Sequence, residues 1–150
     1  MKLDRTWILI ADAARARVLL YRGPEHKLKS VEGLTMEADH KRASELGADK
    51  PGRSFESVGA TRHAVSPHSD PERLEDRRFA IAIMARLDKH ASQAEFEHLV
   101  VVAPPVMLGE LRHALTPHLS TLLTATLDKD LTKIPEAKLA GHLKAVLPLV

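Results

Sequence analysis

The chain has 150 residues, of which 44% are hydrophobic and 28% are charged, and this composition excludes disordered, fibrous and membrane-spanning proteins. Its 22 Lys and Arg residues against 20 Asp and Glu residues give a net charge of +2, so a protein that coats nucleic acid over its whole surface is excluded as well. The sequence contains no cysteine, which excludes disulfides, thiolate zinc sites and cysteine nucleophiles.

The length predicts one domain with its own hydrophobic core. Near the beginning of the chain, the apolar run from Trp7 to Ala11 stops at Asp12. This run is too short for the core of a signal peptide or for a membrane span. We therefore expect a soluble, cytoplasmic protein that does not contact a membrane.

Three strands are predicted in the first 34 residues. Residues 6–11 and 17–21 are rich in large apolar and β-branched side chains, and the short turn between them requires the two strands to be antiparallel. Residues 28–34 alternate without a clearly apolar face, which is typical of an exposed edge strand. These three strands are predicted to form an antiparallel meander. A long stretch without a regular apolar pattern follows them in the sequence.

That stretch, at about residues 47–67, is predicted to be a long flexible loop. It contains three glycines and two prolines and few large apolar groups. Irregular loops longer than about 12–15 residues are uncommon in compact domains and are usually functional or disordered. The loop is therefore the first functional candidate in the chain.

A long helix is predicted over residues 70–92. Ser69 and Glu72 are typical of its first turn, and basic residues follow near its end. Apolar residues recur every four positions, and Ile81 and Met84 widen the apolar stripe, which predicts a deeply buried face. The stripe consists of Phe79, Ile83, Leu87 and Ala91.

The rest of the chain predicts alternating strands and helices. Residues 99–103 form a continuous apolar run that is typical of a strand covered on both faces, and two prolines then start a helix that ends near Leu115. A short turn at Thr116, a strand at 122–127 and a helix from Pro135 follow. The fold class is α/β, with a mixed sheet of about five strands in the order β-β-β-α-β-α-β-α, which ribonuclease-H-like domains share.

A basic rim is the leading candidate site. Residues 40–68 contain five Lys and Arg and three Asp and Glu residues, an excess of +2 that equals the net charge of the whole chain. Such a rim could contact phosphate groups of RNA or of a nucleotide, and an aromatic side chain in it could stack on a base. The alternative interpretations are that the loop is a solvated surface segment and that Phe55 packs against the rest of the domain. The candidate residues are Lys50, Arg53, Phe55, Arg62 and His63 on the loop and Arg73, Arg77 and Arg78 on the helix.

Candidates for catalysis are fewer. Asp12 ends the first strand, where ribonuclease-H nucleases hold a metal, but only Asp128 and Asp130 follow another strand. Asp12 is therefore predicted to be a turn residue that accepts hydrogen bonds from nearby backbone. His63 has no partner spacing that predicts a metal site, and neither a nucleophile elbow nor a glycine-rich phosphate motif is present. We expect no metal and no cofactor.

Several segments together resemble the bacterial host attachment protein family. The resemblance covers nearly the whole chain and rests on residues 6–17, 49–55, 78–80, 99–105, 108–112 and 130–133. It implies a role in the attachment of bacteria to host cells. It also implies similarity to the middle domain of archaeal and eukaryotic peptide-release factors, which has a ribonuclease-H-like fold.

In that release-factor domain, the catalytic Gly-Gly-Gln loop lies between the meander and the long helix. Residues 47–67 occupy this position in the order of elements but contain no Gly-Gly-Gln, so peptidyl-tRNA hydrolysis is not implied. Three hypotheses remain. The first is a noncatalytic cytoplasmic domain that binds RNA, the ribosome or another anionic partner. The second is a hydrolase of phosphate- or nucleotide-containing substrates with Asp12 or His63 as acid or base. The third is a protein-interaction module, such as a dimer formed through residues 28–34.

Overall fold

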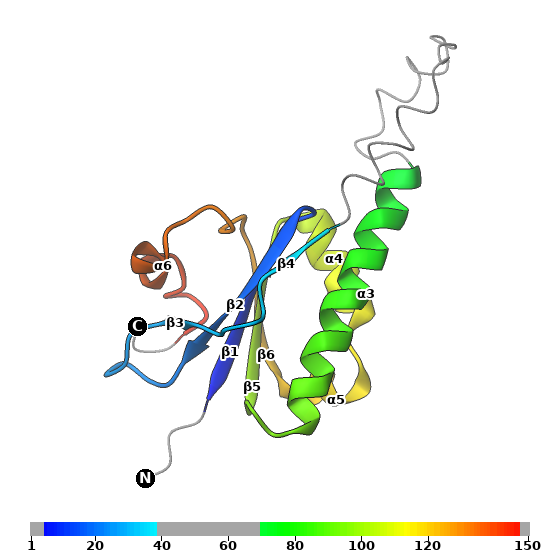
Figure 1. The fold of residues 1–150 in the computed structure, drawn as a ribbon. Coiled ribbons are helices and arrows are strands. Elements are labelled where there is room, and N and C mark those ends of the chain that lie inside the picture. Colours follow the sequence, from blue (N-terminus) through cyan, green and yellow to red (C-terminus); the bar gives the residue numbers. More distant parts are fainter. Residues whose placement is uncertain (1–4, 39–69, 148–150) are drawn as a thin grey trace.

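A mixed sheet of six strands with helices on both faces forms the described part of the chain (Figure 1). The computed structural model describes residues 5–38 and 70–147. Strands follow the order β3-β2-β1-β5-β6 across the sheet, and β4 also pairs with β2. The predicted α/β class with a mixed sheet is therefore confirmed. The predicted loop lies outside the described residues, together with Lys50, Arg53, Phe55, Arg62 and His63.

The centre of the sheet follows the predicted pattern. β1 (Thr6–Ala11) and β2 (Arg15–Tyr21) are antiparallel, whereas β5 (His98–Ala103) runs parallel to β1 on one side and to β6 (Leu123–Asp128) on the other. The carboxyl ends of β1, β5 and β6 therefore meet at one edge of the sheet, which we call the carboxyl edge. In α/β sheets, such an edge is the usual place for functional side chains.

The outer part of the meander differs from the prediction. Of the single edge strand expected at residues 28–34, only β3 (Lys29–Ser30) forms at the edge, and a second short strand, β4 (Met36–Glu37), also pairs with β2. Gly33 has a φ of 78°, a left-handed conformation that turns the chain between them. The following Leu34 is buried, so this segment enters the core rather than continuing along the sheet edge.

Among the residues that the structure describes, helices cover both faces of the sheet (Figure 1). α3 (Asp70–Ser92), α4 (Pro105–Ala114) and α5 (Pro117–Leu122) lie on the first face, and α6 (Glu136–His142) lies on the second. α5 replaces the predicted turn at Thr116, whose hydroxyl oxygen caps the helix by accepting a 3.1 Å hydrogen bond from the Leu119 N–H. No helix within the described ranges is both long and apolar enough to cross a membrane.

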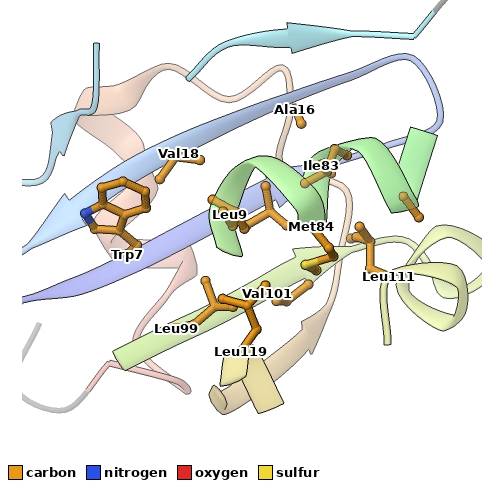
Figure 2. Packing of buried hydrophobic residues seen from close by; sticks show 14 of the residues in the cluster. Trp7, Leu9, Ala16, Val18, Ile83, Met84, Leu99, Val101, Leu111 and Leu119 are labelled. Atoms are coloured by element: carbon orange, nitrogen blue, oxygen red, sulfur yellow. The ribbon is translucent and has the colours of Figure 1, made fainter. Parts of the chain in front are cut away.

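Side chains that alternate along the strands form two cores. Trp7 and Leu9 of β1 face α3, whereas Ile8 and Ile10 face α6. Figure 2 shows the first core, in which residues of β1, β2 and β5 pack against Ile83 and Met84 of α3. Each such large side chain contributes about 1.5–3 kcal/mol when it is fully buried. The two cores fix α3 and α6 to the sheet and so determine which side chains remain exposed.

Candidate functional site

The three predicted arginines of α3 are all exposed. The buried side of the helix includes Asp76 and Phe79, which are 5% and 7% exposed. These two residues flank Arg77 and Arg78 in the sequence. Because residues four apart share a helix face, Arg73 and Arg77 project from neighbouring turns. We call Arg73, Arg77 and Arg78 the arginine face.

Two members of the arginine face form ion pairs with carboxylates of the chain. Arg77 Nε lies 3.5 Å from Glu110 Oε1 on α4, and an Arg78 terminal nitrogen lies 3.1 Å from Glu75 Oε1 one turn earlier. The two arginine side chains are 62% and 55% exposed. Ion pairs with this exposure contribute about 0–1 kcal/mol, so an incoming anion can exchange with these carboxylates at little cost.

Arg73 differs from its two neighbours. Within residues 5–38 and 70–147, no carboxylate forms an ion pair with its exposed guanidinium. It lies in the first turn of α3, directly after the basic segment 40–68 in the sequence. It is therefore the arginine of this face that is most available to a partner.

Apolar surface adjoins the arginine face. Arg77 and Glu110 line a hollow of about 280 Å³ between α3 and α4, together with Ile81. Ile81 is 54% exposed, so the prediction that it widens the buried stripe is wrong. α4 packs against α3 beside it and leaves its side chain at the rim of the hollow. Leu74 and Val106 are also exposed on these two helices, at 45% each.

Asp12 forms the predicted turn at the carboxyl edge. Its Oδ1 accepts hydrogen bonds from the backbone N–H of Ala14 at 2.7 Å and of Arg15 at 2.8 Å. Its own N–H donates to the Arg15 carbonyl oxygen at 2.9 Å. These contacts close the turn between β1 and β2, which is the local role that the sequence predicts.

The other oxygen of Asp12 makes a contact that the sequence does not predict. The hydroxyl of Thr132, which is 7% exposed, lies 2.7 Å from Asp12 Oδ2 and 2.9 Å from Asp130 Oδ1. This hydroxyl therefore links the turn after β1 to the loop after β6. An aspartate two residues before a threonine is a known turn pattern, but nothing in that pattern points to a partner 120 residues away.

The pKa of Asp12 follows from these contacts. Burial raises it, but the hydrogen bonds from Thr132, Arg15 and Ala14 and the positive charge of Arg15 outweigh burial, so the pKa of Asp12 lies below its ordinary value. An effective general base has a pKa nearer to the working pH. Asp12 is therefore an ionised carboxylate whose two oxygens both hold the fold.

Arg17 of β2 holds the same loop from the second face of the sheet. Its guanidinium donates hydrogen bonds to the carbonyl oxygens of Leu131, at 2.9 Å, and of Ile134. Burial lowers the pKa of Arg17, and the charge of Glu136 on α6 partly offsets that effect. We call Asp12, Thr132, Asp130 and Arg17 the carboxyl-edge network.

The described residues offer no arrangement for a metal ion. Among residues 5–38 and 70–147, no group of three or more His, Asp or Glu side chains converges in a geometry suited to metal binding. The carboxyl-edge network contributes two carboxylates, and the hydroxyl of Thr132 lies between them. The network therefore consists of hydrogen bonds that join the turn after β1 to the loop after β6.

Comparison with known proteins places the chain in a family. Residues 7–143 match the model of the family described as "Protein required for attachment to host cells". The chain belongs to this host attachment family. The resemblance inferred from the sequence motifs is thereby confirmed, and the family description refers to attachment without naming a ligand or a reaction.

The chain spans less than half the length of the individual proteins that it matches. It is 33% identical over 69 residues to "Uncharacterized protein RP470" from Rickettsia prowazekii (strain Madrid E), and the match covers 45% of this chain and 46% of that protein. It is also similar to the crystal structure of the archaeal translation termination factor aRF1, with 12% identity and a TM-score of 0.45. That similarity covers 94% of this chain and 38% of the termination factor.

Proposed function

We propose that this host attachment family protein is a noncatalytic, cytoplasmic binding domain that contacts the phosphate groups of RNA, as on the ribosome, through its arginine face. The observation that carries the proposal is the state of Arg73, which is exposed and forms no ion pair with a described carboxylate. A guanidinium binds a phosphate through two parallel hydrogen bonds, so an available arginine is well suited to an RNA backbone.

The neighbours of Arg73 support the same function. Arg77 and Arg78 pair with carboxylates at 3.5 and 3.1 Å, and both arginine side chains nevertheless remain more than half exposed, at 62% and 55%. The preceding segment 40–68 adds an excess of +2 in the sequence. Several cations close together raise the local concentration of a phosphate backbone more than a single cation does.

The carboxyl-edge network supports the noncatalytic part of the proposal. A hydrolase that used Asp12 as acid or base would need its carboxylate free to exchange a proton with substrate. Both oxygens of Asp12 instead accept hydrogen bonds from the protein, and the pKa of Asp12 is lowered rather than raised. The phosphate-contacting arginines, in contrast, lie on α3 and need no proton transfer.

The proposal is tested by sedimentation with ribosomes from the native cells, repeated at salt concentrations from about 50 to about 200 mM. We expect the wild-type protein to sediment with ribosomes at low salt and to dissociate as salt rises. Arg73→Ala should reduce the bound fraction at low salt. Arg22→Ala is the matched control, because Arg22 is also exposed but follows β2 at the opposite end of the sheet.

Two outcomes would contradict the proposal. One is that the wild-type protein stays in the supernatant at every salt concentration. The other is that Arg73→Ala and Arg22→Ala bind equally well, since a nonspecific effect of charge does not depend on position.

A further inference from the structure

A second hollow lies on the opposite face of the sheet from the arginine face. It has a volume of about 450 Å³ and opens between the connection from β2 to β3 and helix α6. Figure 1 shows that this connection and α6 lie on the side of the sheet away from α3. Sites for small ligands typically have volumes of about 300–1,000 Å³, so the hollow is large enough for one small molecule.

The walls of the hollow are mostly apolar. Tyr21, Pro24 and Leu28 line it from the strand side, and Ala137 and Ala140 line it from α6. Tyr21 is 8% exposed and belongs to the second core, so this wall is anchored. The two alanines have the smallest side chains that a helix normally presents, and their size leaves the space open between α6 and the strand connection.

The segment between β2 and β3, part of which lines the hollow, carries an excess of positive charge. The eight residues 22–29 contain three Lys and Arg residues and one Glu, an excess of +2 in a very short segment. Lys27 and His26 belong to the lining itself, and both are exposed. An apolar cavity with a cation at its rim favours a ligand that has an apolar body and a negative group.

The carboxylate in the lining is already engaged by the chain. Glu136 accepts a hydrogen bond from the Ser30 hydroxyl, and its charge acts on the guanidinium of Arg17. Both contacts come from the protein itself. Lys27, in contrast, forms no ion pair with another described residue and can serve a ligand.

We propose that this hollow binds a small organic anion with an aromatic-sized apolar body. The body lies against Tyr21, Pro24 and the two alanines of α6, and the anionic group pairs with Lys27. The site does not depend on RNA binding, because no residue of the arginine face lines it. The proposal adds a small-molecule site to a domain whose family description names only attachment.

Three naphthalene derivatives test the proposal, because they share one apolar body and differ in charge. The full-length protein is titrated with 2-naphthoate, 2-naphthalenemethanol and 2-naphthylmethylamine, and binding is followed by the amide NMR signals of α6 and by calorimetry. We expect 2-naphthoate to bind most tightly, the neutral alcohol about tenfold more weakly and the amine most weakly. Equal affinity for all three compounds, or no binding of 2-naphthoate at millimolar concentration, would overturn the proposal.

Variants locate the binding. Lys27→Ala should lower the affinity for 2-naphthoate about tenfold and leave the affinity for the neutral alcohol unchanged. Lys138→Ala is the control, because Lys138 is an exposed lysine of α6 outside the lining. Ala140→Leu should fill the hollow and abolish binding of all three compounds, and Ala137→Leu serves the same purpose if Ala140→Leu does not fold. The assignment would be contradicted if 2-naphthoate bound with unchanged affinity both to Lys27→Ala and to a variant in which leucine replaces Ala140 or Ala137.

Discussion

The carboxyl-edge network and the arginine face are both polar, but they use their charges in different ways. In the network, Asp12 accepts three hydrogen bonds and Arg17 donates two, all within the chain. On the arginine face, Arg77 and Arg78 have only exposed ion pairs, and Arg73 has no partner among the described carboxylates. The comparison indicates that the network stabilises the fold and that the arginine face is available for binding.

The largest expected effect comes from removing the carboxylate of the network. Asp12→Ala leaves two backbone N–H groups and the Thr132 hydroxyl without their acceptor, and we expect a loss of about 2 kcal/mol in the free energy of unfolding. Urea denaturation measures it. Asp128→Ala is the control, because Asp128 is exposed at the end of β6 and its side chain accepts no such bonds from the described residues, and it should stay within about 0.5 kcal/mol of wild type. RNA binding should be unaffected by either change.

A smaller loss is expected for the second anchor of the loop. Arg17→Met keeps an extended apolar chain but removes the donors to Leu131 and Ile134, and we expect a loss of about 1–2 kcal/mol. The half-buried guanidinium is also costly to desolvate, so removing it recovers part of the loss. Amide hydrogen exchange should become faster in residues 129–135 and remain unchanged in α3. Equal acceleration in α3 would contradict a local role.

The pH dependence of stability gives a finer test of the network. Because folding lowers the pKa of Asp12, its carboxylate contributes stability that is fully present above the ordinary Asp pKa of about 3.9. That contribution is lost as pH falls through the lower pKa of the folded state. We expect the difference in unfolding free energy between wild type and Asp12→Asn to shrink between about pH 4 and pH 2. A difference that stays constant over this range would show that the charge of Asp12 does not contribute.

The smallest change in stability is expected on the arginine face. Glu110→Gln breaks the 3.5 Å ion pair with Arg77, and the free energy of unfolding should change by less than about 0.5 kcal/mol. Affinity for RNA should rise about twofold, since the guanidinium is released from its carboxylate. Glu32→Gln is the matched control, because Glu32 is exposed and forms no ion pair with a described residue. A similar gain in both variants would mean that only net charge matters.

Local patterns in the sequence predict most of the fold. The helix predicted at residues 70–92 is α3, with the same bounds, because its first turn and its four-residue apolar spacing are both local signals. The covered central strand is confirmed for the same reason, since residues 99–103 are apolar on both faces. The edge strand at 28–34 is confirmed only at Lys29–Ser30, because the left-handed turn at Gly33 overrides a weak alternation.

The candidate site is less accessible to prediction from sequence. The turn role of Asp12 follows from its neighbours, but its bond to Thr132 joins residues 120 positions apart and depends on the packing of two loops. Arg17 gives one signal, since a charged residue in an apolar strand requires partners. For the arginine face, the sequence predicts the position of the three side chains, whereas the ion pair of Arg77 depends on how α4 packs against α3.

The most direct test of the central claim is the salt dependence of affinity for a single-stranded RNA oligonucleotide, compared between wild type, Arg73→Ala and Arg22→Ala. If Arg73 contacts a phosphate, Arg73→Ala should weaken binding and reduce the slope of log K against log salt by about 0.7, the value for one phosphate contact on a single strand. Arg22→Ala should keep the wild-type slope. Identical slopes and affinities for the two variants would contradict the assignment of RNA binding to the arginine face.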